Sequence, residues 1–160
     1  MPPQRRTAHR HPDHGFSLVE LLITLIVASL LAAADQRIDA SVWMLAGGDL
    51  VSMLAYSKEP GIRRGRKQWL NRVGSTPAEF VKNHQGLLID PLDYAGRVDP
   101  ERVLMVVANF DRVVPKENAR RLWEAAGRPH IRTVPTGHFS AIVVYPLSKR
   151  WTVDFLKERL

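Results

Sequence analysis

The chain has 160 residues, of which 45% are hydrophobic and 24% charged, and its formal net charge is +7. This composition is ordinary for a globular protein, so it excludes collagen-like and low-complexity chains, and the length suffices for one small domain. The sequence contains no cysteine, which excludes disulfides, thiolate metal sites and cysteine nucleophiles.

The positive charge comes mainly from two places, a leader before residue 15 and the stretch 58–72, "KEPGIRRGRKQWLNR". The second stretch has one aromatic residue, Trp69, and carries no zinc-finger, RNP or basic-zipper pattern. We interpret it as a solvated helix face, and we expect no nucleic-acid partner.

Residues 1–14, "MPPQRRTAHRHPDH", are polar and basic and show no apolar periodicity, so we expect a disordered basic leader. Three histidines lie near Asp13, but a polar tract offers them no supporting groups, and we predict no metal site there. The whole sequence indicates neither a metal nor an organic cofactor.

An apolar segment follows at 15–34, and only four polar residues interrupt it between Phe16 and Ala34: Ser17, Glu20, Thr24 and Ser29. As a helix rising ~1.5 Å per residue it spans about 28 Å, close to the ~30 Å hydrocarbon core of a bilayer. Arginines precede it and Asp35 follows it, which favours a membrane-associated chain with a cytoplasmic N-terminus. The alternative is a helix buried in a soluble cytoplasmic protein.

The stretch "GFSLVELLITLIVASLL" resembles the start of type IV prepilins and pseudopilins, which have a glycine, then a phenylalanine, then a glutamate at the fifth mature position. The resemblance implies that a prepilin peptidase cuts between Gly15 and Phe16 and methylates the new terminal Phe16. It also implies that Glu20 pairs with the terminal amine of a neighbouring subunit during assembly.

Residues 35–160 do not continue like a pilin. Short apolar runs at 39–48, 101–110 and 130–135 alternate with helical patterns at 115–127 and 146–160. Such alternation predicts an α/β fold with about three parallel strands. The stretch 49–100 is punctuated by glycine and proline, and we expect a cap-like insert of two or three short helices there.

Two chemistry-bearing residues follow two of these strands. Asp111 comes just past the strand 102–108, and His138 comes just past the strand 130–134. Functional residues collect at the carboxyl ends of parallel strands, so adjacent strands would bring the two side chains together. An aspartate that orients an imidazole is the acid–base part of a Ser-His-Asp triad.

This arrangement resembles the C-terminal part of the α/β-hydrolases, in particular their dienelactone-hydrolase and acetylesterase-like members. The segments that carry the likeness are "LAGGDL", "IDPLDYAGRVDPERVLMVVANFDRVVP" and "GRPHIRTVPTGHFSAI". The resemblance implies that Asp111 is the triad acid, that His138 is the base, and that the substrate is a small acyl ester.

The nucleophile of such enzymes lies on a G-x-S-x-G elbow, and the chain has no complete one. The nearest match places Ser17 between Gly15 and Val19, and valine in place of the last glycine would strain the turn. We therefore expect an impaired ester or acyl hydrolase with Ser17 as its weak candidate nucleophile. The alternative function is a pseudopilin-like, membrane-anchored structural or secretion component with a non-enzymatic head.

Two accounts of the N-terminal segment remain open. Either a prepilin-like segment at 15–34 precedes a truncated hydrolase-like domain at 35–160, or the apolar helix is a nucleophile helix buried behind the sheet. With half of a hydrolase sheet missing, one apolar strand edge would be unpaired, which predicts either poor solubility or a partner that covers the edge.

Overall fold

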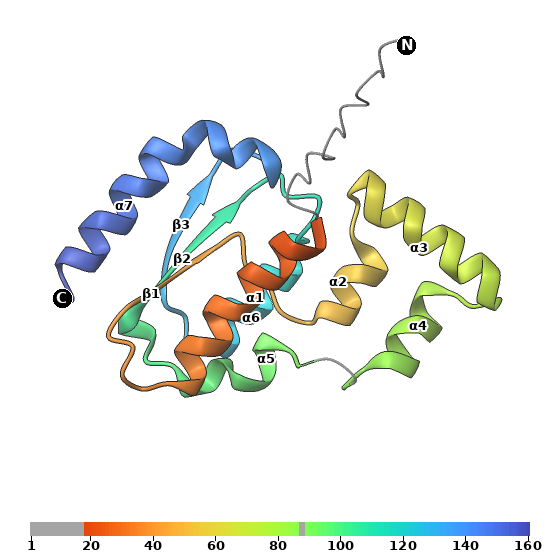
Figure 1. Ribbon diagram of the computed structural model, residues 1–160, viewed down its shortest axis with the longest axis horizontal. Coiled ribbons are helices and arrows are strands. Elements are labelled where there is room, and N and C mark those ends of the chain that lie inside the picture. The colour runs from red at the N-terminus through yellow and green to blue at the C-terminus, as the bar shows by residue number, and fades with distance from the viewer. Residues whose placement is uncertain (1–17, 87–88) are drawn as a thin grey trace, which may run out of the picture.

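The computed structural model describes residues 18–86 and 89–160, and it describes side chains in the first helix from Ile26 onward. Figure 1 shows the elements, which run in chain order α1 (Leu18–Ala34), β1 (Ser41–Met44), α2 (Leu50–Tyr56), α3 (Pro60–Val73), α4 (Pro77–His84), α5 (Pro91–Tyr94), β2 (Val103–Ala108), α6 (Lys116–Ala125), β3 (His130–Val134) and α7 (Tyr145–Lys157). Three short 3-10 helices join them, namely η1 (Ala95–Arg97), η2 (Pro100–Arg102) and η3 (Phe139–Val144).

The strands form one parallel sheet in the order β1-β2-β3, which confirms the prediction of about three parallel strands. The register pairs Ser41 with Val103 and Leu104 with His130. Strand β2, "VLMVVA", is apolar throughout because it lies in the middle of the sheet and is covered on both faces.

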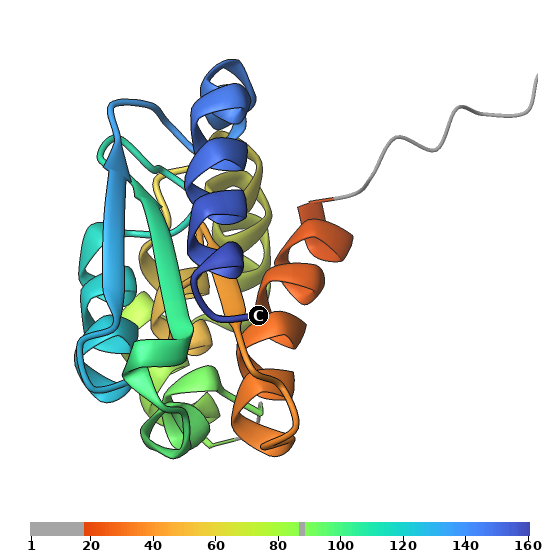
Figure 2. The ribbon, with the colours of Figure 1, turned by 90° about the vertical axis from the view of Figure 1, so that its left-hand side faces the viewer.

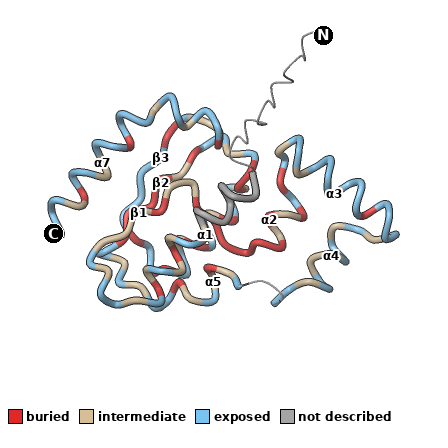
Figure 3. Tube along the Cα trace, in the orientation of Figure 1, coloured by how far each residue is buried: buried red, intermediate tan, exposed pale blue. Residues whose placement is uncertain are grey.

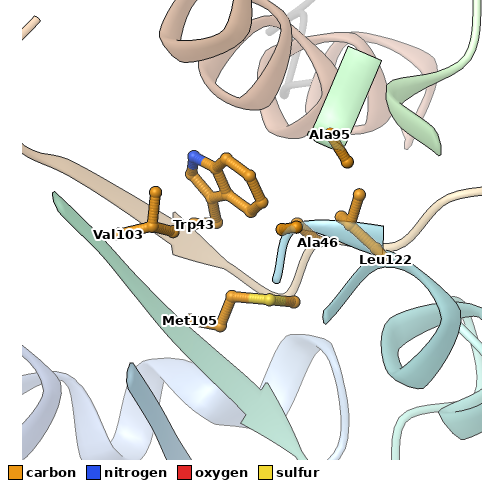
Figure 4. Close-up of a cluster of buried hydrophobic side chains, with 7 residues drawn as sticks. Trp43, Ala46, Ala95, Val103, Met105 and Leu122 are labelled. Atoms are coloured by element: carbon orange, nitrogen blue, oxygen red, sulfur yellow. The ribbon is translucent and has the colours of Figure 1, made fainter. Parts of the chain in front are cut away.

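Helices cover the two faces of the sheet separately, because successive strand residues point to opposite faces. One face packs against α1, α5 and α6 through a core that Figure 4 shows, with Trp43 and Met105 on the strands and Leu122 on α6. The other face packs against Phe155 of α7 through Leu104, Val106 and Ala108 of β2. The sheet is therefore the middle of three layers.

The insert 49–100 is helical, as predicted, but its described residues form four α-helices, α2 to α5, instead of the two or three expected. Its outer part, α3 and α4, forms a separate lobe (Figure 1). Figure 3 shows that α2 is largely buried, that α3 is largely exposed, and that α4 has a mixture of exposed and intermediate residues. The Trp69 and Phe80 rings are nearly perpendicular, with centroids 5.2 Å apart, and Phe80 stacks on His84 at 4.5 Å. These aromatic contacts hold α3 against α4 at a distance from the sheet.

Helix α1 packs on the domain through one face. Ala28 and Ala32 contact the core around Trp43, and Ser29 and Ala33 are buried. The prediction of a helix able to cross a membrane finds no counterpart in the described ranges, where no helix is both long and apolar enough for it.

Candidate functional site

Asp111 and His138 meet at one edge of the sheet, as their positions after β2 and β3 predicted. Nδ1 of His138 lies 2.7 Å from Oδ2 of Asp111. The two side chains are only 2% and 5% exposed. Because both strands run parallel, their carboxyl ends deliver the two loops to the same place.

The second oxygen of Asp111 is held by the backbone that follows it. The N–H groups of Val113 and Val114 donate to Oδ1 at 2.8 and 2.9 Å. Both valines are buried in the core with Leu50 and Met53, so the turn cannot shift without disturbing the core. The carboxylate is thus oriented by the loop and not only by its histidine.

The loop that carries His138 is tied to the loop of Asp111 by the backbone. Phe110 donates its N–H to the carbonyl of Thr136 at 2.9 Å, and Asn109 donates to that of Val134 at the same distance. A Cβ on Gly137 would lie 3.3 Å from the Phe110 carbonyl oxygen. Glycine therefore allows the two loops to approach closely just before the histidine.

The imidazole has one nitrogen committed and one available. The ionised carboxylate of Asp111 can only accept, so Nδ1 of His138 donates to it. In a neutral ring the proton is then on Nδ1, and Nε2 is left as an acceptor. Nε2 is buried and has no hydrogen-bond partner among the described residues. Buried polar atoms are almost always paired, so this unpaired nitrogen is unusual and is available to accept a hydrogen bond or a proton.

A cavity of about 340 Å³ opens beside this histidine. Phe110 and Phe139 contribute large exposed rings to its wall, and Arg112 and Glu59 contribute charges. The backbone N–H groups of Gly61 and Ile62 hold the pKa of Glu59 below its ordinary value of 4.5, so its carboxylate is ionised at neutral pH.

A third loop, after β1, reaches the same edge of the sheet. The Asp90 carboxylate accepts hydrogen bonds from the N–H groups of Asp49 and Leu50, and the Asn118 amide donates to the carbonyls of Gly48 and Asp49. Asp49 also pairs with Arg121. The sequence reasoning did not single out Asp90 or Asn118; the Asp90-Pro91 pair was a visible helix-start signal.

The remaining predicted residues are not part of the described site. Gly15, Phe16 and Ser17 lie outside the described residues, and Glu20 lies in α1 where side chains are not described. Helix α1 begins at Leu18, the residue after Ser17. Among the residues with described side chains, no three histidine, aspartate or glutamate groups come together as they would around a metal ion.

Comparison with known families finds the N-terminal resemblance again. A family model described as the prokaryotic N-terminal methylation motif matches residues 10–34. The protein YdjC of Bacillus subtilis (strain 168), described as uncharacterized, is 27% identical over 94 residues, which make up 59% of this chain and 79% of YdjC.

Solved structures share the fold of the sheet region. The Pyrococcus furiosus esterase Pf2001 superposes with a TM-score of 0.58 at 19% identity, over 84% of this chain and 50% of the esterase. The enol-lactonase of Burkholderia xenovorans LB400 gives 0.53 at 15%, over 84% of this chain and 63% of the lactonase. The fold is therefore α/β-hydrolase-like, and the chain spans half to two thirds of these proteins.

Proposed function

We propose that this chain hydrolyses small acyl esters by serine-hydrolase chemistry, at a rate impaired by its incomplete nucleophile elbow. The observation that carries the proposal is the buried Asp111–His138 pair with an unpartnered Nε2. His138 is buried, its Nδ1 is paired with Asp111, and its Nε2 has no partner among the described residues. These are the surroundings of a general base. The esterase-like fold supports the same class of reaction.

Each residue then has a defined role. Ser17, directly before α1, attacks the ester carbonyl through Oγ while its proton passes to Nε2 of His138. The imidazolium, stabilised by Asp111, returns this proton to the leaving alcohol, and water then releases the acid from the acyl-serine. Val19 replaces the glycine that relaxes such an elbow, so we expect the attack to be slow.

A fluorophosphonate tests this proposal directly, because it adds covalently only to an activated serine. The intact mass of the purified full chain should gain one adduct, and both Ser17→Ala and His138→Ala should abolish it. His130→Ala removes an exposed histidine outside the site and is the matched control, which should label like the wild type. Labelling that persists in His138→Ala would refute the role of the pair.

A second function is supported by the match of residues 10–34 to the N-terminal methylation motif. In this proposal the leader 1–14 and Gly15 are removed, Phe16 is methylated, Glu20 serves assembly, and the domain 35–160 is a non-enzymatic head at the membrane. Its partners are the membrane and a prepilin peptidase.

Mass spectrometry of the chain expressed together with a prepilin peptidase tests the second function. The expected product lacks residues 1–15 and carries one added methyl group on Phe16, and Gly15→Leu should leave the chain uncut. A chain that stays intact and fractionates away from membranes under these conditions would count against it.

A further inference from the structure

The two outer strands of the sheet differ in how they are protected against pairing with other chains. Strand β3 carries the charged residue Arg132 and the polar His130 and lies between Pro129 and Pro135, all devices that discourage strand addition. Strand β1, "SVWM", has neither charge nor proline. Its sequence is that of an interior strand, although it lies at the edge of the described sheet.

The backbone of β1 offers two residues for pairing on its outer side. Leu45 donates its N–H to the Val106 carbonyl of β2 at 2.7 Å. The backbone groups of successive strand residues point to alternate sides. The N–H and C=O groups of Trp43 therefore point toward β2, and those of Val42 and Met44 point away from it. The N–H and C=O groups of Val42 and Met44 make no hydrogen bond to any other described element.

Apolar side chains of α1 lie at the same border of the molecule. Figure 2 shows α1 beside β1, at the opposite side of the sheet from β3. Its residues Val27 and Leu31, one helical turn apart, are 42% and 53% exposed. An uncharged strand edge and an apolar helix stripe therefore occur together on one side.

We propose that this border binds a second copy of the chain, with the two β1 strands antiparallel about a two-fold axis. A strand without charge is self-complementary, since the two-fold axis brings Val42 opposite Met44 of the second copy and no like charges meet. An axis perpendicular to the sheet also keeps both α1 helices on one face, where their exposed stripes can cover each other. The same operation at β3 would bring basic side chains together.

The leader of the same chain is a poor alternative occupant of this edge. Residues 1–14 carry three prolines and several charges, and proline removes the N–H donors that a paired strand needs. The chain also spans only 50% of the esterase and 63% of the lactonase that it resembles. A second copy supplies an apolar strand that the described part of one chain does not.

Sedimentation velocity of the full chain tests this proposal, with Val42→Pro as the main variant. Proline at an outward-facing position removes the N–H needed for pairing but spares the bonds to β2. The wild type should be a dimer, and Val42→Pro should weaken dimerisation about tenfold or more, by loss of the paired N–H groups and the register that they set.

Ile131→Pro is the matched control. Val134 accepts from Asn109 of the β2 end, so Ile131 faces away from β2 on the other edge, and its proline variant should remain a dimer. Leu31→Arg provides a second route, because this exposed position tolerates arginine in the monomer while the dimer would bring two arginines together. Circular dichroism melts verify that each variant is folded.

Each remaining outcome overturns the proposal. A wild type that is monomeric up to about 100 µM would do so, because a specific dimer of micromolar affinity is populated at that concentration. A dimer that persists equally in Val42→Pro and Leu31→Arg would show that another surface forms it. A dimer lost only in Ile131→Pro would assign it to β3.

Discussion

The two halves of the proposed catalytic site are supported very differently. Asp111 and His138 stand on loops that several hydrogen bonds hold in place, and Asp111 alone accepts three. The segment that would carry the nucleophile starts a helix whose described part touches the domain through small residues such as Ala28 and Ala32. A site can thus keep its acid–base half by local packing while its nucleophile half depends on elements elsewhere in the chain.

The difference follows from where the supporting contacts come from. Asp111 is positioned by residues two and three places along the chain. The loop of His138 is positioned by backbone hydrogen bonds from Asn109 and Phe110. A nucleophile elbow needs a strand on its N-terminal side to aim the serine. Residues 1–14 have no apolar pattern that would form such a strand.

The largest expected effect is on the reaction rate, from a change at Asp111. Asp111→Asn keeps an oxygen for the N–H groups of Val113 and Val114 but loses the charge that stabilises the His138 imidazolium. We expect the rate of fluorophosphonate labelling, or of ester hydrolysis, to fall by up to about 10⁴-fold. The free energy of unfolding in urea should change little by comparison.

Asp111→Ala separates structure from chemistry in the same loop. It leaves two buried N–H groups and the His138 Nδ1 without an acceptor, so the free energy of unfolding should fall by about 3 kcal/mol or more. The control Asp93→Asn changes an exposed aspartate, and it should alter neither the rate of labelling nor the free energy of unfolding. Equal stability of the two Asp111 variants would contradict the positioning role of the loop.

Much of the fold could be predicted from local patterns. The helical pattern at 115–127 gives a helix at 116–125, because proline at its start and glycine at its end mark both ends. The apolar run at 39–48 gives a strand of only four residues, Ser41–Met44. It stops there because Leu45 adopts a positive φ of 56°, which starts the turn toward Gly47.

The part of the site at the ends of the strands could be predicted from the sequence. The side chains that hold the loop after β1 could not. The spacing of Asp111 and His138 after two apolar strands was sufficient to bring them together. Asp90 reaches residues about 40 positions away in the loop after β1, and no sequence pattern reports such a partner. Glu59 was missed because its role at the cavity follows from how the insert folds back.

The docking of α1 can be tested by comparing adjacent positions on the same helix. Ala28→Asp would bury a short carboxylate against Trp43, whereas Val27→Asp places it on the exposed side. Ala28→Asp loses up to about 0.7 kcal/mol of helix propensity and Val27→Asp loses almost none. The first variant should be less stable by about 3 kcal/mol in total, mostly because of the buried charge. Equal urea midpoints would mean that α1 does not pack on the domain in solution.

The loop after β1 should respond to added volume because it packs against the loop of the acid. A Cβ on Gly47 would lie 2.6 Å from Cγ1 of Val114. Gly47→Ala should therefore cost about 1 to 3 kcal/mol of unfolding free energy by overpacking. The matched control is Gly65→Ala in helix α3, where a Cβ meets nothing within 4 Å and the higher helix propensity should stabilise by up to about 1 kcal/mol.

The smallest effect concerns the cavity wall in the insert and depends on pH. Because backbone N–H groups lower the pKa of Glu59 in the folded chain, its carboxylate stabilises the start of α3 above the unfolded pKa of about 4.5. This stabilisation is lost as the pH falls through the lower folded pKa, and Glu59→Gln lacks it at every pH. Thermal melts should show the wild type slightly more stable than Glu59→Gln at neutral pH, with the gap closing as the pH falls below the unfolded pKa of about 4.5 and through the lower folded pKa. Solvent screening keeps the gap small, and a gap that widens on acidification would show that the interaction has the opposite sign.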